Sequence, residues 1–452
     1  MRTILQTKAK PIFQEEKEFI ESKLNIEIPN DCWIVGGGTK YVYLDIYSKS
    51  PCIKFKVYGD GKFELIRDDR EKFKNYEPMT ISQTIQEEKD RLLDKWNKDV
   101  ERTADFVSQR RDIPYNISIS GGKDSEVIYN LWKEMLTKLD FVPDYEFVFF
   151  NTSNEVGDVY RYIKARKDIR IINPKVGWYQ FLKNHNYMLP STHRRYCCSI
   201  YKEGQVKKTY DTSLPRVQIT GMRNKESTKR SKYEFFMDYE FDKSLYGLSN
   251  QPKSWSKLCP IIDWSTTDVW LLIILKGFFI NQKYKYGFTR VGCCICPFSN
   301  SYDDELIRFY YPYIWKRFEK IVKRNYEIFP QAKCSGYTVE EYINGKWKTP
   351  LGKDFEFLNK KPTPVNIHNF AEYKGLSDEM AEKFWSRECG LCGKQCSPVA
   401  MSMFYRVYGR KEGESDNRKP ICTSCFCKQN NITKKQFYIM ASKFKEEGCT
   451  LF

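Results

Sequence analysis

The first hundred residues combine one helical pattern with several strand patterns. Apolar side chains recur at helical spacing from Pro11 to Leu24, and every second residue is apolar in runs between Trp33 and Leu65. A turn at Gly59–Gly61 between two such runs predicts a hairpin. A long amphipathic helix is expected over Ile81–Val107. These elements predict a small α+β module over residues 1–105, and we find no candidate chemistry in its sequence.

Residues 106–330 alternate short apolar runs with helical patterns, which is typical of βαβ units on a parallel sheet. Strands are expected at Ile117–Ile119, Glu146–Phe150 and Ile169–Ile172. The predicted fold class is α/β, with a doubly wound and mostly parallel sheet. Ligands of such sheets bind beyond the carboxyl ends of the strands. We therefore expect residues 120–125 and 151–155, which follow the first two strands, to border one crevice.

The pattern becomes weaker after this domain. A long helix is expected over Asp303–Ile328, and Pro312 should kink it or split it in two. Asn344-Gly345 between two apolar runs suggests a hairpin. Residues 331–385 are assigned to a connecting segment, in which Lys360–Pro364 resembles a linker.

The first predicted strand of this domain runs directly into S-G-G-K-D-S at 120–125, and a helical pattern follows. Strand, glycine turn and helix start together form an anion site, because glycines let the backbone approach a phosphate and the positive helix end faces it. Lys123 adds a full charge, and Asp124 offers a carboxylate for Mg²⁺. The residues expected to bind the nucleotide are Ser120, Gly121, Gly122, Lys123, Asp124 and Ser125. An ordinary helix start with two turn glycines is the alternative.

Composition and charge narrow the choice of partner and compartment. The net charge is +17, with 75 basic and 58 acidic residues, and aromatic residues make up 16% of the chain. Both features favour a nucleic acid partner, although a solvated lysine-rich surface is as good an account. The longest apolar run, Val269–Ile280, is too short to span a bilayer and predicts a buried helix or strand. We therefore expect no membrane association.

The polar first ten residues lack a secretory signal pattern, so a cytoplasmic protein is expected. In that compartment the 16 cysteines are better explained by metal or cluster ligation than by disulfides. The chain has only three histidines, and none of them is expected to act as a catalytic base.

Four further motifs follow the loop in order. They are R-x-C-C-x-x-x-K at 195–202, G-x-R-x-x-E-S-x-x-R at 221–230, P-I-x-x-W-x-x-x-D-V-W at 260–270, and G-C-x-x-C-P at 292–297. The loop itself is not of the Walker type. It resembles the PP-loop of the ATP pyrophosphatases, the adenine nucleotide alpha hydrolase-like enzymes of HUP-like fold. The complete set resembles the phosphoadenosine phosphosulfate (PAPS) reductase family over residues 111–300.

The resemblance implies roles for individual residues. Lys123 matches the family's phosphate lysine and Asp124 its metal-linked aspartate. Lys202 and Arg223 are donors suited to phosphate or sulfate and complete the predicted catalytic set. Glu226 and Arg230 are expected to assist nucleotide binding. Surface salt bridges are the alternative for these basic residues.

The cysteines within the resemblance suggest a cluster. Cys197, Cys198, Cys293 and Cys296 supply four soft thiolates, which suit an iron–sulfur cluster or zinc. An adjacent pair fits tetrahedral zinc poorly, because neighbouring side chains diverge. The combination resembles the [4Fe–4S] ligands of cluster-containing reductases and of the related DNA-phosphorothioation ATPases. Buried, unligated cysteines are the alternative, and Cys294 and Cys259 compete for places in the set.

Residues 386–452 predict a small zinc module. Cys389-x-x-Cys392 and Cys422-x-x-Cys425 are two knuckles with the spacing of a structural zinc site. So small a segment would depend on the metal for folding. The surrounding basic residues suggest nucleic acid binding or the joining of domains. A rival interpretation rests on Glu388–Leu391, since E-C-G-L is similar to the tail of the sulfonucleotide reductases and would make Cys389 a redox nucleophile.

These patterns predict an enzyme that cleaves ATP to AMP and pyrophosphate and activates a substrate for sulfur transfer, with nucleic acid as one acceptor class. The expected cofactors are ATP, Mg²⁺, a [4Fe–4S] cluster and Zn²⁺. The expected partners are the nucleotide substrate, nucleic acid and a sulfur donor such as a cysteine desulfurase. A thiol-dependent PAPS or APS (adenosine 5'-phosphosulfate) reductase is the first alternative, and the loop lysine argues against it. A nucleic-acid-binding zinc protein with a relict nucleotide fold is the second.

Overall fold

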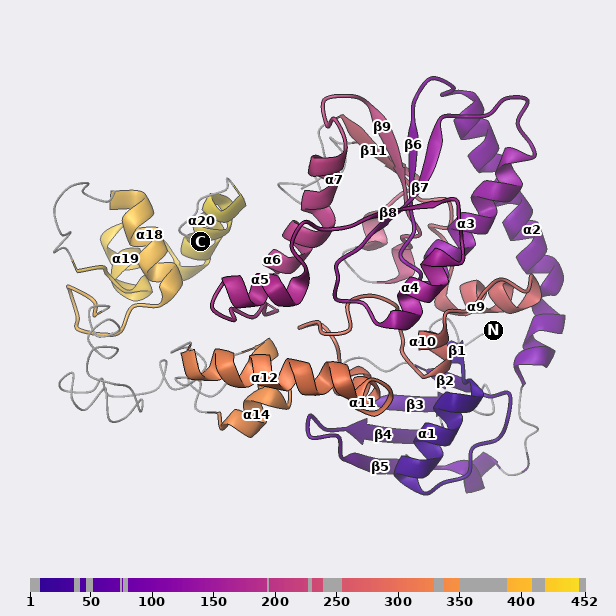
Figure 1. Cartoon of the computed structure of the whole chain (residues 1–452). Helices are drawn as coiled ribbons and strands as arrows, with labels where there is room; N and C mark the ends of the chain where they lie inside the picture. Colours follow the sequence, from indigo (N-terminus) through magenta and orange to yellow (C-terminus); the bar gives the residue numbers. More distant parts are fainter. Residues whose placement is uncertain are drawn as a thin grey trace. The chain divides into compact units, whose positions relative to one another are not determined.

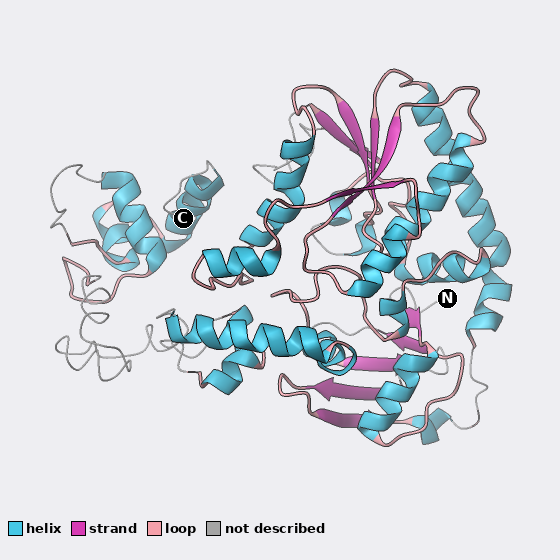
Figure 2. Ribbon diagram, viewed as in Figure 1, coloured by secondary structure: helices cyan, strands magenta, loops and turns pink. Residues whose placement is uncertain are grey.

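The structure is a computed structural model of the chain (Figures 1 and 2). It describes residues 9–35, 41–45, 52–73, 75, 80–192, 195–226, 230–238, 254–328, 337–349, 388–408 and 419–446. The chain divides into two compact units, and the division falls between Ile321 and Val322. The predicted linker at Lys360–Pro364 lies outside the described residues.

The N-terminal residues form an antiparallel sheet in the order β1-β2-β3-β4-β5. Its elements are β1 (Ala9–Pro11), α1 (Gln14–Leu24), β2 (Trp33–Val35), β3 (Val42–Asp45), β4 (Ile53–Val57) and β5 (Phe63–Asp68). The predicted hairpin is confirmed, since β4 pairs with β5 and Gly61 has φ +86° in the turn between them. Phe19 of α1 packs on Phe309, with ring centroids 5.0 Å apart. This sheet therefore shares a core with the helix that carries Phe309.

The larger sheet has six strands in the order β10-β11-β9-β6-β7-β8 (Figure 1). They are β6 (Tyr115–Ser118), β7 (Tyr145–Phe150), β8 (Ile169–Ile172), β9 (Arg216–Ile219), β10 (Phe236–Met237) and β11 (Trp255–Leu258). All neighbouring pairs are parallel except β10 with β11. The predicted α/β fold with a mostly parallel sheet is confirmed.

The strand order places a ligand-binding position at the centre of this sheet. The chain runs from β6 outward through β7 to β8, and then returns to β9 on the other side of β6. The order therefore reverses between β6 and β9, and ligands of open α/β sheets bind beyond the carboxyl ends of strands at such a point. The segments that leave β6 and β9 begin at Ile119 and Thr220, so both predicted nucleotide motifs start there.

Helices cover and connect these strands. They are α2 (Ile81–Ser108), α3 (Lys123–Leu136), α4 (Gly157–Lys164), α5 (Trp178–Asn184), α6 (Tyr196–Cys198), α7 (Gly204–Thr209), α9 (Thr266–Leu275), α10 (Gln282–Lys285), α11 (Ser301–Tyr310) and α12 (Pro312–Ile328). α2, α3 and α9 pack against one another. As predicted, the apolar run that starts at Val269 lies largely in a buried helix, and Pro312 separates two helices instead of lying inside one.

The second unit is helical among its described residues. It contains α14 (Val339–Ile343), the short 3₁₀ turn η6 (Lys346–Lys348), α18 (Pro398–Tyr408), α19 (Thr423–Gln429) and α20 (Lys434–Glu446). The hairpin predicted around Asn344-Gly345 is wrong. The Thr338 side chain caps α14 in a reciprocal capping box with Glu341, and Gly345 at φ +113° begins the 3₁₀ turn instead of joining two strands.

Within the described part of the chain, no helix has the length and apolar character needed to cross a membrane.

Candidate functional site

The S-G-G-K-D-S loop leaves the carboxyl end of β6 and opens α3. Gly121 has φ +76°, a left-handed conformation that favours glycine. The Ser120 backbone N–H donates to Ser125 Oγ at 3.2 Å, and Ser125 Oγ donates to the Gly122 carbonyl oxygen at 2.9 Å. The loop is therefore closed by its own two serines, with the amino end of α3 beside it.

Two cations hold the carboxylate of Asp124. Lys123 Nζ lies 2.6 Å from Asp124 Oδ2, and Arg223 Nε lies 2.8 Å from Oδ1. Arg223 is only 2% exposed. Burial alone would raise the pKa of Asp124, but the positive charges and hydrogen bonds of Lys123 and Arg223 outweigh it, and the pKa lies below its ordinary value. The structure thus brings together three of the four predicted catalytic residues.

Arg223 reaches the loop because glycine precedes it in its motif. A Cβ on Gly221 would lie 2.8 Å from the backbone carbon and oxygen of Asp124, so only glycine allows this approach. Arg223 Nη1 also donates to the Trp264 carbonyl oxygen at 3.2 Å. Its Nη2 lies 3.3 Å from Glu226 Oε1, and Glu226 is ion-paired with Arg230 in turn. The predicted residues Glu226 and Arg230 thus support Arg223.

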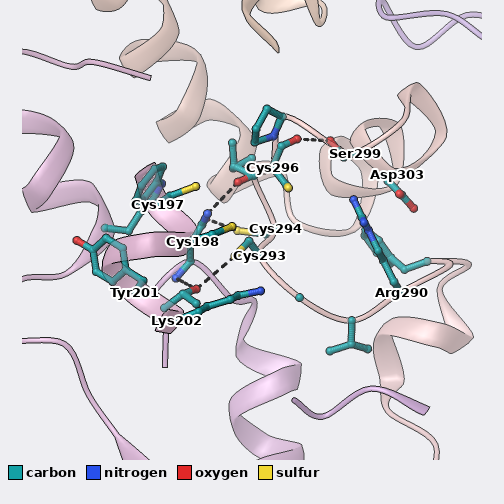
Figure 3. A pocket seen from close by; sticks show the side chains of 18 of the residues that line it. Cys197, Cys198, Tyr201, Lys202, Arg290, Cys293, Cys294, Cys296, Ser299 and Asp303 are labelled. Carbon is teal, nitrogen blue, oxygen red and sulfur yellow. Dashed lines mark hydrogen bonds between the residues drawn. The ribbon is translucent and has the colours of Figure 1, made fainter. Parts of the chain in front are cut away.

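Lys202, the fourth predicted catalytic residue, lies at a different place. It lines a cavity of about 140 Å³ together with the four predicted cluster ligands, which are Cys197, Cys198, Cys293 and Cys296 (Figure 3). The negative charge of Cys293 is the main reason that the pKa of Lys202 is raised, and burial opposes it. Lys202 is therefore placed to balance negative sulfur.

Two short segments supply the cavity's cysteines (Figure 3). α6 carries Cys197 and Cys198, and the loop before α11 carries Cys293, Cys294 and Cys296. A hydrogen bond from Cys197 lowers the pKa of Cys198 to about 6. The same contact raises the pKa of Cys197. One thiolate is therefore favoured on α6.

The two competing cysteines have other partners, although Cys294 also lines the cavity. Cys294 Sγ donates to Asn154 Oδ1 at 3.1 Å, and the Cys294 backbone N–H donates to the Asn154 carbonyl oxygen at 2.6 Å. Cys259 is buried in a separate apolar cluster with Met237 and Ile262. Cys293 Sγ has a longer contact of 3.5 Å with Thr152 Oγ1, so Cys294 is the more firmly held of the two, which favours Cys293 and Cys296 as ligands.

The cavity fits a cluster better than a single ion. Among the described residues, its sulfurs are not gathered as closely as the ligands of one metal ion are. Cluster ligands stand further apart, because the iron–sulfide core lies between them. Soft thiolate donors on two facing segments are the ligand set that an iron–sulfur cluster requires.

The second unit holds a tighter cysteine group. The sulfur atoms of Cys389, Cys392, Cys422 and Cys425 all lie within 4.8 Å of one another. The Cys422 backbone N–H donates to Cys389 Sγ at 3.2 Å. Burial raises the pKa of Cys389, but hydrogen bonds from backbone N–H groups, Cys422 first, outweigh it and lower the pKa to about 7. Four converging thiols with two backbone-supported knuckles fit a tetrahedral zinc ion.

This group also bears on the rival interpretation of Cys389. Its side chain is 2% exposed and its sulfur lies inside the four-thiol group. A redox nucleophile must reach its substrate, so this environment suits a metal ligand better.

Sequence reasoning missed two residues that contact the nucleotide loop. The Lys123 backbone N–H donates to the Tyr284 hydroxyl oxygen at 3.0 Å, and Asn281 Nδ2 donates to the Gly121 carbonyl oxygen at 3.2 Å. Asn281 also caps α10 by accepting from the Lys283 backbone N–H. The cap was visible in the sequence, but its contact with a loop 160 residues away was not.

Comparisons with known proteins agree with this architecture. Residues 114–299 match the family described as the phosphoadenosine phosphosulfate reductase domain. The chain is 28% identical over 275 residues to an uncharacterized protein of Methanocaldococcus jannaschii, covering 59% of the chain and 60% of that protein. It is 26% identical over 207 residues to an adenosine 5'-phosphosulfate reductase of Staphylococcus epidermidis, covering 44% of the chain and 76% of the reductase. The chain spans between half and two thirds of the two M. jannaschii relatives that it matches, at 60% and 54% of their lengths.

Two solved structures are also similar. One is the PAPS reductase of Candida auris in a phosphate complex, with a TM-score of 0.33 and 17% identity over 46% of the chain and 93% of that protein. The other is the U34-tRNA thiolase of Methanococcus maripaludis with its [4Fe–4S] cluster, with a TM-score of 0.30 and 14% identity over 53% of the chain and 80% of the thiolase.

Proposed function

We propose that the chain cleaves ATP to AMP and pyrophosphate and so activates a substrate for sulfur transfer, in line with the match of residues 114–299 to the phosphoadenosine phosphosulfate reductase domain. One observation carries the proposal. Lys123 and Arg223 converge on Asp124 at the point where the strand order reverses, beside the amino end of α3. This is a preorganised site for a polyphosphate, since helix end and cations all favour negative charge.

In the proposed reaction an oxygen of the acceptor attacks the α-phosphorus of ATP. A new bond forms from that oxygen to phosphorus, and the bond from phosphorus to the bridging α–β oxygen breaks. Pyrophosphate leaves with the electron pair, and the charge of Lys123 and the N–H groups of the loop stabilise it. A hydrosulfide-level sulfur then displaces AMP from the activated acceptor, so that sulfur replaces the oxygen without a redox change.

Asp124 suits a second task once the nucleotide is bound. Its oxygens are hard donors of the kind that Mg²⁺ prefers. Lys123 Nζ is held at Asp124 Oδ2 in this structure, and a bound polyphosphate would compete for that ammonium group. Movement of Lys123 towards phosphate would free Oδ2 for Mg²⁺, while Arg223 keeps Oδ1 and fixes the orientation of the carboxylate.

The cavity cysteines are assigned to the sulfur side of the reaction. Cys197, Cys198, Cys293 and Cys296 would hold a [4Fe–4S] cluster. Such a cluster would carry the sulfur or anchor the two segments. Lys202 would balance its negative charge. A sulfur donor such as a cysteine desulfurase would deliver sulfur to the cavity. In the second unit, structural Zn²⁺ would be held by Cys389, Cys392, Cys422 and Cys425.

The acceptor is proposed to be a nucleic acid. The net charge of +17 supports a polyanionic partner. A cytoplasmic setting, in which these thiols stay reduced, accompanies this proposal.

The similarity to adenosine 5'-phosphosulfate reductases supports a second candidate, the reduction of a sulfonucleotide by a thiol. That reaction releases sulfite and forms no pyrophosphate. The burial of Cys389 in its thiol group speaks against this nucleophile, and no other cysteine in the described chain stands in the E-C-G-L context.

Pyrophosphate release tests the proposal. The chain, purified without oxygen, is incubated with ATP, Mg²⁺, sulfide and bulk tRNA or DNA, and pyrophosphate is measured with a coupled enzyme. Lys123→Ala should abolish the release, because it removes the charge next to the leaving group. Lys133→Ala is the matched control on the same helix, since Lys133 pairs with Asp168 at the surface, and it should leave the rate unchanged. Absence of pyrophosphate together with sulfite from PAPS and thioredoxin would establish the reductase instead.

A further inference from the structure

A short helix connects the nucleotide loop with the cysteine cavity. We propose that α10, with its cap Asn281, couples nucleotide binding to the cysteine loop at Gly292–Cys296. Asn281, Lys283 and Tyr284 act as positioning residues in this link. The proposal rests on the proposed function in one respect, since it takes the S-G-G-K-D-S loop as the nucleotide site.

On the loop side, α10 makes two buried hydrogen bonds to the backbone. The Tyr284 hydroxyl accepts the Lys123 N–H at 3.0 Å, and Asn281 Nδ2 donates to the Gly121 carbonyl oxygen at 3.2 Å. Both side chains are 2% exposed. A Cβ on Gly122 would lie 3.3 Å from the Tyr284 hydroxyl, so the phenol also limits how the loop can move. α10 and its cap therefore bond to the loop on both sides of Gly122.

On the cavity side, the same helix holds the residues before the first cavity cysteine of that loop. Lys283 Nζ donates to the Gly292 carbonyl oxygen at 3.2 Å. Burial raises the pKa of Tyr284, and the nearby Val291 backbone N–H offsets part of that rise, so the cysteine loop passes beside the phenol. Lys283, Val291 and Gly292 all line the cavity. Two neighbouring residues of α10 thus bond to different segments, Tyr284 to the nucleotide loop and Lys283 to the cysteine loop.

These contacts give a physical route for coupling. Tyr284 is bonded to the nucleotide loop and the adjacent Lys283 is bonded to Gly292, so a shift of Tyr284 with the loop is passed to the cysteine loop through one peptide unit. A four-residue helix anchored by its Asn281 cap moves as a unit. Polyphosphate binding that draws Lys123 from Asp124 shifts the backbone to which Tyr284 is bonded. Thermodynamic linkage makes such coupling reciprocal. If the bound nucleotide changes the affinity of the cavity for a group, then that group changes the affinity of the loop for the nucleotide by the same factor.

Spatial continuity alone does not establish coupling, so the test measures the response of one site to the other. The full chain is kept anaerobic, and adenosine 5'-(α,β-methylene)triphosphate is the probe because its α–β link resists cleavage. Calorimetry measures its affinity. Iodoacetamide labelling, mapped by mass spectrometry, measures the alkylation rates of Cys293 and Cys296 with and without the nucleotide. We expect the nucleotide to change these rates by roughly fivefold or more in the unmodified chain.

Two variants separate the ends of the link. Tyr284→Phe keeps the ring and removes the oxygen that accepts the Lys123 N–H, so nucleotide affinity should fall roughly tenfold for one lost buried hydrogen bond and the change in alkylation should disappear. Lys283→Met cuts only the cavity side, so affinity should hold while the response at Cys293 is lost. The control is Tyr342→Phe, which removes a buried phenol hydrogen bond of 2.9 Å to Asn325 in the other unit; it should retain both properties.

The outcomes are distinct. An unchanged alkylation response in Tyr284→Phe would overturn the link, because the hydroxyl would then not be needed for it. Tighter nucleotide binding in that variant would also overturn it, because the hydroxyl would then compete with phosphate for the Lys123 N–H. No response in the unmodified chain would also overturn it. Binding and response without pyrophosphate release would keep the link and remove the proposed reaction. Absence of nucleotide binding would remove both.

Discussion

The ion pair between Asp124 and Arg223 allows a quantitative test of the site. Arg223→Met keeps most of the apolar volume and removes the charge that holds Asp124 Oδ1. Asp124→Asn keeps the shape and removes the other charge. The double variant removes both, so a double-mutant cycle isolates the interaction of the two side chains.

The structure sets the expected size of this interaction. Two unit charges about 4 Å apart attract by about 4 kcal/mol at an effective dielectric constant of about 20. The full value is not expected, because the Asp124 side chain is 21% exposed and Lys123 and Glu226 remain as partners in the variants. We therefore expect a coupling free energy of about 2–3 kcal/mol. Arg223→Met alone should destabilise the first unit by about 3 kcal/mol, because it leaves a largely enclosed carboxylate short of one partner.

Equilibrium urea unfolding, followed by tryptophan fluorescence, measures these free energies, since most of the tryptophans lie in the first unit. The chain has two units, so coincidence with circular dichroism must first show that this transition is two-state. A matched cycle on Lys133 and Asp168 is the control. That pair has a similar distance of 3.0 Å but nearly half-exposed side chains, and it should give at most about 0.5–1 kcal/mol.

The pH dependence provides a second reading of the same pair. The folded-state pKa of Asp124 lies below its ordinary value. Its contribution is therefore complete above about pH 4, the unfolded-state value, and is lost as the pH falls through the lower folded-state value. In Asp124→Asn, the free energy of unfolding should therefore fall less steeply as the pH drops below about 4. A coupling free energy below about 0.5 kcal/mol, equal to that of the surface pair, would refute the reasoning that burial makes this pair strong.

Three further predictions concern other parts of the chain. Cys422→Ser should remove one bound zinc per chain, measured by mass spectrometry of the metal, and unfold the C-terminal module, measured by proteolysis; retained zinc would contradict the four-thiol site. Gly221→Ala should lower stability by about 1–3 kcal/mol and weaken nucleotide binding, because its Cβ would meet the Asp124 backbone at 2.8 Å; unchanged affinity in calorimetry would mean that the loop relaxes freely. Burial would raise the pKa of Asp268, but Arg91 and the cap of α9 outweigh it, so the pKa lies below its ordinary value. Asp268→Asn should therefore reduce the loss of unfolding free energy that urea unfolding measures below about pH 4. An unchanged loss of unfolding free energy in this pH range would contradict the prediction.

Local sequence was sufficient for the conformation of the S-G-G-K-D-S loop and for the four-thiol group. Strand, glycine turn and helix at 115–136 depend on neighbours in the chain, and the structure has them where the pattern predicts them. The paired C-x-x-C spacing brings four sulfurs together with few other requirements. The hairpin prediction at Asn344-Gly345 is wrong because a second local signal lies just before it. Thr338 forms a capping box with Glu341, and this box starts a helix where the hairpin needed a strand.

Contacts between distant segments could not be derived in this way. Lys202 was grouped with the catalytic residues because of its charge and motif, but the fold places it among the cavity cysteines. The choice between Cys293 and Cys294 depends on Asn154, which lies on the loop after a different strand. Sequence spacing carries no information about which of two adjacent cysteines a distant segment will hold by hydrogen bonds.

The sequence by itself determined the α/β class, the strand–glycine turn–helix loop and the four-thiol group, because each depends on residue type at short spacing. Only the tertiary structure decided that Asp124 is held between Lys123 and Arg223, and that Tyr284 accepts a hydrogen bond from the backbone of the S-G-G-K-D-S loop. Those partners lie 99 and 161 residues apart. They meet because the strand order reverses between β6 and β9 and because α10 packs beneath the loop, and both depend on how the whole core packs.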